Sequence, residues 1–324
     1  MLKYIKVKPL AAESFGVRSM ATLVETPDLK IILDPGASLG VRREYPPHPE
    51  EYKVLRRSIR RIINAARNAG YIFISHYHLS HYLPFFRDYR HIWSNRKYAT
   101  ELYSGKFVYM KSTTENITDS EKRRGDFLKK RIEQMNGTVV YGDYSEHIIG
   151  NTLLKISPPV PHGRISMRRG YVLMISIMYE AEKFLFAPDV LGPYDPYTLE
   201  IILRDNPDVL YICGPPLHLK KSFGPISVKR ATDNLKRLIE KIDTIILDHY
   251  IFRSSHGVVL FQDLKKLAEE KRHKIYTAAT FSRRHNNFLE SIRQKLWEVY
   301  PPKEEFRDWL ELGDEIKRIT PPSI

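Results

Sequence analysis

Three histidines lie within six residues of one another, directly after a short apolar run. The run occupies residues 71–75 (YIFIS), and His76, His78 and His81 follow it. Imidazole is the commonest neutral metal ligand in proteins, and residues two apart beyond a strand end can turn inward together. Core packing and a solvated surface explain such a cluster poorly, which leaves a chance grouping in a loop as the alternative. The spacing therefore predicts a metal site.

Other potential ligands also follow apolar runs. Asp34, Asp189 and His249 each stand at the end of a predicted strand, as His76 does. Several strands could therefore deliver ligands to one edge of a sandwich of sheets. Cys213 is the only cysteine, which excludes both an internal disulfide and a site built on several thiolates. A metal in this chain must rest on imidazole and carboxylate groups.

The elements that must position these residues can be predicted from apolar periodicity and turn residues. A hairpin is expected at 22–25 and 30–33, a helix over 49–69, a strand at 71–75, and a helix from Thr118 to about Met135 followed by a strand at 138–141. Further strands are expected at 153–156, 171–179 and 183–187. Helices (197–204, 228–239, 261–271) then alternate with strands (209–213, 244–247, 274–277), and closing helices are expected at 286–299 and 306–312.

Two β-rich stretches, each followed by alternating helices and strands, predict two packed sheets with helices outside. No linker rich in Gly, Ser or Pro divides the chain, so one domain is expected over residues 1–324, with a helical insertion near 49–69 and closing helices near 286–312. Apolar runs stop after about 8 residues, far short of the ~20 that a membrane span needs. The N-terminus lacks the pattern of a signal peptide. We therefore expect a cytoplasmic protein without a membrane partner.

The net charge of +14 suggests attraction to an anionic partner, and a heat-adapted basic surface is the alternative. Basic residues gather on two of the predicted helices. One carries Lys53, Arg56, Arg57, Arg60, Arg61 and Arg67, and the other carries Lys122, Arg123, Arg124, Lys129, Lys130 and Arg131.

Five motifs, taken in order, resemble those of the metallo-β-lactamase superfamily. The histidine cluster is similar to its His-x-His-x-Asp-His signature. Residues 31–36 (IILDPG), 160–163 (VPHG), 186–189 (FAPD) and 247–249 (LDH) resemble the remaining four. Any one motif is weak, but five in the family's order extend from Asp34 to His249. The overall pattern most resembles a stand-alone archaeal branch of the superfamily, from which no substrate can be carried over.

The resemblance implies an α+β protein with a four-layer αββα sandwich. It also implies that His76, His78 and His162 form a first metal site, that His81 and His249 contribute to a second, and that Asp189 joins the two. Asp34 would orient the metal loop through a hydrogen bond to a ligand imidazole or a loop amide. One or two divalent ions are expected, zinc by default, although iron or manganese would suit the same ligands. A metal-bound water with a pKa near ~7 would be the nucleophile.

One residue departs from the family pattern. Ser80 stands where the signature has its aspartate. A hydroxyl is a poorer ligand for a divalent cation than a carboxylate, and it cannot act as a general base near neutral pH. Binding of a second metal ion and transfer of a proton therefore both depend on which group takes the role of that aspartate.

The remaining histidines carry weaker signals. His218 follows a strand and could donate a proton or contact substrate, or it could be a structural loop residue. His256 is expected to cap or precede a helix, and Asp248 either supports His249 or ends its strand. Lys220 and Lys221 could place positive charge at the mouth of the site, or belong to a rigid turn. The other histidines are expected to be solvated: His48, His91, His147, His273 and His285.

Three functions remain open. The leading hypothesis is a hydrolase that uses metal-activated water on a small anionic ester, phosphoester or lactone-like substrate. The second is a nuclease or RNA-processing enzyme, which would use the basic helices for phosphate contacts. Against it, the stretch between Asp189 and His249 is too short for the large inserted domain of one nucleic-acid-cleaving branch. The third is a metal-binding module that lost turnover with Ser80. The sequence indicates no oligomeric state.

Overall fold

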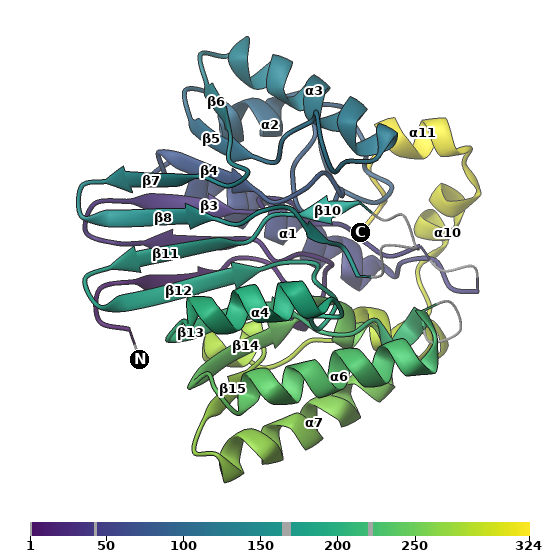
Figure 1. The fold of residues 1–324 in the computed structure, drawn as a ribbon. Coiled ribbons are helices and arrows are strands. Elements are labelled where there is room, and N and C mark those ends of the chain that lie inside the picture. The colour runs from purple at the N-terminus through teal and green to yellow at the C-terminus, as the bar shows by residue number, and fades with distance from the viewer. Residues whose placement is uncertain (1, 42–43, 164–169, 220–222) are drawn as a thin grey trace.

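The structure, a computed structural model, describes residues 2–41, 44–163, 170–219 and 223–324 (Figure 1). The first sheet has the strand order β1-β2-β3-β4-β5-β6. Its strands are β1 (Lys6–Pro9), β2 (Thr22–Glu25), β3 (Lys30–Leu33), β4 (Tyr71–Ile74), β5 (Phe107–Met110) and β6 (Thr138–Tyr141). Strands β1 to β3 are antiparallel, which confirms the predicted hairpin, and β3 to β6 are parallel. The carboxyl ends of β3 and β4 therefore lie at the same edge.

The second sheet has the order β15-β14-β13-β12-β11-β8-β7. Its strands are β7 (Glu146–Ile149), β8 (Thr152–Ile156), β11 (Ile175–Tyr179), β12 (Glu182–Ala187), β13 (Val209–Cys213), β14 (Thr244–Asp248) and β15 (Lys274–Tyr276). Strands β12 to β15 run parallel, so β12 and β14 also end at one edge. A separate two-stranded sheet pairs β9 (Val160–Pro161) with β10 (Tyr171–Val172).

The strands of the first sheet bury both faces, each against a different layer. Leu33 and Phe73 pack toward the second sheet. Ile32 and Ile72, one residue earlier in each strand, pack with the helices outside the first sheet. This alternation follows from the two-residue period of a strand.

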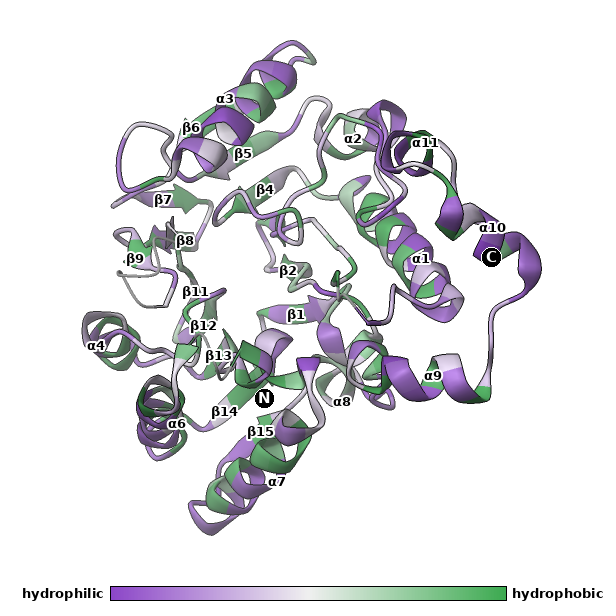
Figure 2. Cartoon of the chain, turned by 90° about the vertical axis from the view of Figure 1, so that its right-hand side faces the viewer, coloured by the Kyte–Doolittle hydropathy of each residue, from purple (hydrophilic) through white to green (hydrophobic). Residues whose placement is uncertain are grey.

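Helices cover the two outer faces. The core outside the first sheet includes residues of α1 (Pro49–Ala66), α2 (Arg96–Tyr103) and α3 (Asp119–Glu133). The core of the second sheet takes in residues of α4 (Pro196–Asp205), α6 (Pro225–Ile239) and α7 (Ser255–Glu270). In Figure 2, α1 and α2 lie on one side of the strands, with α4 and α6 on the other. The fold is the expected four-layer αββα sandwich.

Short segments complete the chain. They are the 3₁₀ turns η1 (Glu13–Phe15), η3 (Leu217–Leu219), η4 (His249–Arg253) and η5 (Leu289–Ile292), and the helices α8 (Ala278–Phe281), α9 (Arg293–Val299), α10 (Glu304–Glu311) and α11 (Asp314–Ile319). None of the helices in the described ranges is both long and apolar enough to cross a membrane.

Helix α1 begins with a capping residue that the sequence analysis assigned wrongly. His48, expected to be solvated, is only 3% exposed. Its side chain accepts a hydrogen bond from the backbone N–H of Glu50, and its Nε2 lies 2.8 Å from the carbonyl oxygen of Tyr300. The Glu51 carboxylate in turn accepts from the His48 backbone N–H at 2.8 Å. This capping box satisfies N–H groups that the first helical turn leaves unpaired.

The strand expected over 171–179 is two strands, and the interruption serves the histidine cluster. β10 ends at Val172 and β11 begins at Ile175. Between them, the backbone N–H of Leu173 donates to the carbonyl oxygen of Ser75, at 3.0 Å. The break therefore ties this segment to the residue before His76.

Gly36 shows how closely the loop after β3 approaches the cluster. A Cβ atom there would lie 2.3 Å from the backbone nitrogen of Tyr82 and 2.7 Å from the carbonyl carbon of His81. Both atoms are backbone, so neither can rotate away as a flexible side chain would.

We predict that Gly36→Ala lowers the free energy of unfolding by roughly 2 kcal/mol, within the usual range for an overpacked site. Gly70→Ala is the matched control, because a Cβ at Gly70 meets nothing within 4 Å. Denaturant unfolding of both variants checks the expectation. Equal losses would contradict the proposed contact.

Candidate metal centre

Four strand ends bring the candidate residues together. Asp34 follows β3, His76 follows β4, Asp189 follows β12 and His249 follows β14. Asp34, Asp189 and His249 adopt left-handed backbone conformations, with φ of 46°, 50° and 66°. Such conformations are costly for residues other than glycine and are concentrated at functional sites. The backbone therefore turns sharply where each strand delivers its side chain.

One group of side chains surrounds a single carboxylate oxygen. His76 Nε2 and His78 Nδ1 are 3.0 Å apart. Asp189 Oδ2 lies 3.3 Å from His76 Nε2, 3.7 Å from His78 Nδ1 and 3.5 Å from His162 Nε2. A tetrahedral zinc site with bonds of roughly 2.0–2.1 Å has edges of about 3.4 Å. The spacing therefore fits a divalent metal at the centre of these four atoms.

A second group meets the other oxygen of the same carboxylate. Asp189 Oδ1 lies 3.2 Å from His81 Nε2 and 3.3 Å from His249 Nε2. His81 Nε2 and Asp189 Oδ1 are buried, yet neither has a well-aligned hydrogen bond to another described residue. Unsatisfied buried atoms that converge on one point are what a cation site requires. These three residues could hold a second ion, with Asp189 facing both positions.

Ser80 contributes nothing to either group. It is half-buried, and its side chain makes no hydrogen bond within the described ranges.

Asp34 contacts both the backbone before the cluster and one of its imidazoles. Its carboxylate accepts hydrogen bonds from the Ser75 backbone N–H at 2.8 Å and from the Ser75 hydroxyl at 2.6 Å. Asp34 Oδ2 also lies 2.8 Å from His81 Nδ1. Because a carboxylate only accepts, His81 Nδ1 carries the proton and Nε2 is left to face Asp189. Asp34 therefore fixes both the ring and its tautomer.

The same chain of hydrogen bonds reaches His76. The Ser75 hydroxyl donates to Asp34, so it can accept from His76 Nδ1, which lies 2.9 Å away. That leaves His76 Nε2 without a proton, directed at Asp189. One buried carboxylate thus orients a ring in each of the two groups.

Glu13 supports His249, which the sequence did not reveal. This buried residue of η1 places Oε2 3.0 Å from His249 Nδ1, while its Oε1 accepts from Arg253 Nε at 3.0 Å. Oε2 accepts no aligned hydrogen bond from the described residues, so Glu13 acts on His249 through its negative charge, while His249 Nε2 faces Asp189. The only available signal was an acidic residue within an apolar stretch, AAESF at 11–15.

Arg253 lies against the face of His249. Its Nη2 is 2.9 Å from Nε2 and 3.3 Å from Nδ1 of the imidazole. The lone pairs of these two ring nitrogens diverge, so one atom close to both must lie over the ring, not in its plane. The guanidinium also sits 3.8 Å from the centre of the Tyr250 ring. Arg253 therefore clamps both rings through stacking and its ion pair with Glu13.

Tyr250 is a second residue that the sequence analysis missed. Its hydroxyl lies 3.3 Å from His162 Nε2 and 3.5 Å from Asp189 Oδ2, among the potential ligands of the first group. His218, a predicted catalytic residue, stacks on the outer face of this arrangement. Its ring is 6.1 Å from the Tyr250 ring and tilted by 14°. His218 thus stacks on Tyr250, and Tyr250 in turn approaches His162 and Asp189.

Glu121 in the first turn of α3 faces His78. Its buried Oε1 lies 3.9 Å from His78 Nε2 and accepts no hydrogen bond from the described residues.

Asp248 supports the backbone and makes no hydrogen bond to the His249 ring. It accepts from the backbone N–H groups of Ser14, His249 and Ala278, at 3.1, 2.7 and 2.9 Å. Asp248 therefore holds the turn that follows β14.

Burial and neighbouring charges shift the pKa values of these groups in different directions. Burial, together with the like charges of His81 and His78, lowers the pKa of His76 to about 4. Burial also opposes charge on His81, but Asp189 and Asp34 outweigh it and raise the pKa of His81 to about 10. Burial would raise the pKa of Asp189, yet His81 and the other imidazoles hold that pKa well below its usual range. His76 is therefore ready to bind a cation, whereas His81 must first lose a proton.

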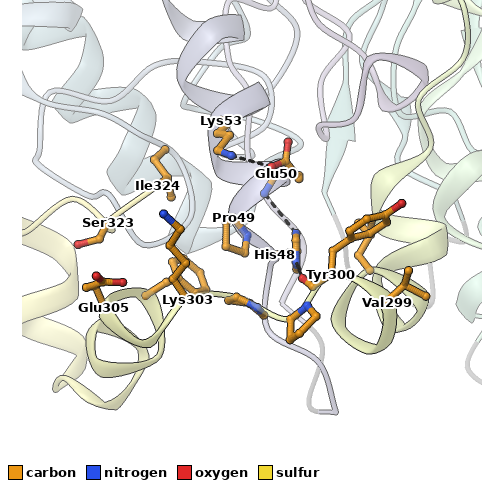
Figure 3. Close-up of a pocket in the computed structure, with 14 residues that line it drawn as sticks. His48, Pro49, Glu50, Lys53, Val299, Tyr300, Lys303, Glu305, Ser323 and Ile324 are labelled. Carbon is orange, nitrogen blue, oxygen red and sulfur yellow. Dashed lines mark hydrogen bonds and ion pairs between the residues drawn. The ribbon is translucent and has the colours of Figure 1, made fainter.

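Two sets of residues lie apart from this centre. Lys220 and Lys221, predicted at the mouth of the site, fall outside the described residues. A cavity of about 960 Å³ opens elsewhere, between the start of α1 and the segment from Val299 to Lys303 (Figure 3). None of the six potential metal ligands lines it.

Known proteins resemble this chain in sequence and in fold. No family model matches. The chain is 35% identical over 294 residues to a UPF0282 protein of Methanopyrus kandleri, covering 90% of this chain and 99% of that protein. It is 37% identical over 295 residues to one of Thermococcus gammatolerans, covering 90% and 95%. These relatives are archaeal, as the resemblance to an archaeal branch implied.

Among solved structures, CmlA, a diiron β-hydroxylase from Streptomyces venezuelae, matches with a TM-score of 0.52 and 10% sequence identity. The match covers 86% of this chain and 53% of CmlA, so the chain spans about half of that longer protein. At this identity the likeness concerns the fold alone. Together with the layer order, it shows that the chain shares the fold of CmlA.

We predict that Glu13→Gln weakens metal binding at the second group by roughly 10–100-fold, the usual cost of removing a partner that orients a ligand. The amide lacks the negative charge that Glu13 places beside His249 and that pairs with Arg253. Competition with a chelating dye measures the affinity. Glu25→Gln is the control, because Glu25 pairs with lysines on β1 and β3. Unaltered affinity in Glu13→Gln would show that Glu13 does not position His249.

Proposed function

Because this chain belongs to the UPF0282 protein family and has the metallo-β-lactamase fold, we propose that it is a metal-dependent hydrolase. Its proposed substrate is a small anionic ester, phosphoester or lactone-like molecule. The supporting observation is the convergence of five imidazoles on the two oxygens of Asp189, with spacings that suit a divalent cation.

In this proposal His76, His78 and His162 hold the first metal ion, and His81 and His249 hold the second. Asp189 contacts both. Zinc suits a site rich in imidazole, and iron or manganese would accept the same ligands. A bound cation supplies Lewis acidity and lowers the pKa of a coordinated water toward neutrality.

The chain's own residues supply orientation and proton positions. Asp34 holds protons on His81 Nδ1 and, through Ser75, on His76 Nδ1. Glu13 places its negative charge 3.0 Å from His249 Nδ1. The Tyr250 hydroxyl is close enough to the first group to donate a hydrogen bond to a substrate oxygen there. Tyr250 is thus the proposed donor, and His218 supports its ring from behind.

The substrate class rests on charge. The chain has a net charge of +14, and the buried Arg253 adds a positive charge beside the second group that Glu13 balances. An anionic substrate is therefore favoured. We further propose that the chain acts as one domain in the cytoplasm. A nuclease and a metal-binding module without turnover remain the alternatives.

The first test combines metal content with hydrolysis. His76→Ala and His162→Ala should each weaken first-site binding by more than about 100-fold, since even an outer partner is worth ~10–100-fold. Both variants should lose hydrolysis of whichever test substrate the unaltered protein cleaves among a nitrophenyl ester, a nitrophenyl phosphodiester and a lactone. His285→Ala, at an exposed position, is the control. Equal metal retention in all three variants, measured after dialysis, would refute the ligand assignment.

The second test concerns Ser80. Two divalent cations here would face the single carboxylate of Asp189, so they would repel each other with little compensation in a buried site. The proton on His81 must also be displaced. We expect one tightly held metal per chain, and Ser80→Asp should tighten the second site by at least about tenfold. Chelator titration decides it, and two equally tight metals in the unaltered protein would contradict the charge argument.

A further inference from the structure

A cleft of about 420 Å³ lies beside the histidine cluster, within the usual size range of small-molecule sites. One wall is the segment that follows the cluster, and the other is α3. The lining residues are Tyr82, Pro84, Phe85, Phe86, Ser120, Arg123, Arg124, Phe127 and Leu128.

We propose that this cleft binds an aromatic base attached to a phosphate, as in a nucleotide or a single-stranded nucleic acid. The proposal deepens the proposed function, on which it rests, because it names the part of a phosphoester substrate that lies outside the metal centre.

The position of the cleft supports this. Tyr82 directly follows His81, and Glu121, one residue after Ser120, faces His78 at 3.9 Å. Arg124 Nη1 donates to the carbonyl oxygen of Tyr77, at 3.1 Å, within the cluster itself. A ligand in the cleft would therefore adjoin residues that directly follow or contact the potential metal ligands.

Helical spacing directs the necessary side chains to one face. Ser120, Arg123, Arg124 and Phe127 lie at positions i, i+3, i+4 and i+7 of α3, so they share a face. Glu121, Gly125 and Leu128 are buried against the protein on another face. The cleft wall is thus a continuous stripe of one hydroxyl, two guanidinium groups and one aromatic ring.

Two phenylalanine rings of the cleft are exposed to solvent, although apolar rings are usually buried. Phe86 and Phe127 are 44% and 43% exposed, although they come from different walls of the same cleft. Arg131 lies 5.1 Å from the centre of the Phe127 ring and holds it in place. Exposed aromatic rings beside arginines provide the stacking surface that bases use in single-stranded nucleic-acid sites.

Two lysines of α3 are paired within the helix, whereas Lys130 and Arg131 have no ion pair with a described carboxylate and lie outside the cleft lining. Lys122 pairs with Asp126 at 2.9 Å, and Lys129 pairs with Glu133 at 3.8 Å. Neither Arg123 nor Arg124, in contrast, has an ion pair with a carboxylate within the described ranges. These two guanidinium groups are therefore available to a phosphate, for which their fork of N–H groups is well suited.

The larger cavity in Figure 3 lacks this combination. Its Lys53 already pairs with Glu50 at 2.7 Å, and Lys303 shares the lining with Glu305. It contains no arginine and none of the metal-site residues. Charge and position therefore favour the smaller cleft as the anion site.

The test compares two ligands that differ only in the base, AMP and ribose 5-phosphate. Calorimetry on the unaltered protein should give roughly tenfold tighter binding of AMP, the modest end of what stacking on an aromatic ring contributes. Phe127→Ala should remove this preference without changing ribose 5-phosphate affinity, and Phe127→Trp should keep it. Arg123→Gln should weaken both ligands by about tenfold.

Tyr144→Ala and Lys130→Gln are the controls, because both residues are exposed and neither lines the cleft. They should leave both affinities unchanged. Equal affinity of AMP and ribose 5-phosphate in the unaltered protein, or a preference that survives Phe127→Ala, would overturn the proposal. If a short oligoadenylate binds more tightly than AMP, with strong salt dependence, the proposal is supported and the natural ligand is a nucleic acid. If the two bind equally, the proposal is supported and the natural ligand is a free nucleotide.

The His76→Ala variant separates this proposal from the proposed function. The preference for AMP should persist there, because Phe127 does not depend on the metal. If the unaltered protein hydrolyses none of the test substrates but prefers AMP, the proposed function fails and the cleft proposal stands. If the unaltered protein hydrolyses a test substrate but shows no preference for AMP, the cleft proposal fails alone.

Discussion

The buried carboxylate of Asp189 imposes the constraint that organises the site. A negative charge without exposure to water is costly unless positive or hydrogen-bonding groups surround it. Here five imidazoles approach its two oxygens, and they come from several separate segments of the chain. The ends of strands from both sheets must therefore meet at one edge of the sandwich. The chain also turns sharply at Asp34, Asp189 and His249.

Further carboxylates support the imidazoles from outside. Asp34 holds a proton on His81 Nδ1, and Glu13 places its negative charge beside His249 Nδ1. Glu121 faces His78 from α3. These carboxylates come from the segment before β2, the end of β3 and a helix outside the sheets. Burial of Asp34 is offset by hydrogen bonds from Ser75 and by His81, and burial of Glu13 is offset by Arg253.

The elements that could be predicted are those whose signals lie in residues adjacent in sequence. The hairpin of β2 and β3, the helix from Pro49 and the strand before His76 follow from local periodicity, and Asp34, Asp189 and His249 could be found because each ends an apolar run. Glu13, Tyr250 and Arg253 could not, because only the packing of η1 against η4 gives them their partners. Strand β1 was missed because it is short, charged and at a sheet edge, where alternation is weak. The break after Val172 was invisible because its cause is a hydrogen bond to Ser75.

The Glu13–Arg253 pair has a consequence for the order in which the molecule is made. Its two members lie 240 positions apart along the chain, and Ser14 and Asp248 are 234 apart. Contacts of such long range require most of the polypeptide to be present before they form. During translation His76, His78 and His81 emerge long before Asp189, His249 and their supports. The three histidines are therefore made well before the groups that surround them in the folded chain, and the site is complete only once His249 and Arg253 have been added.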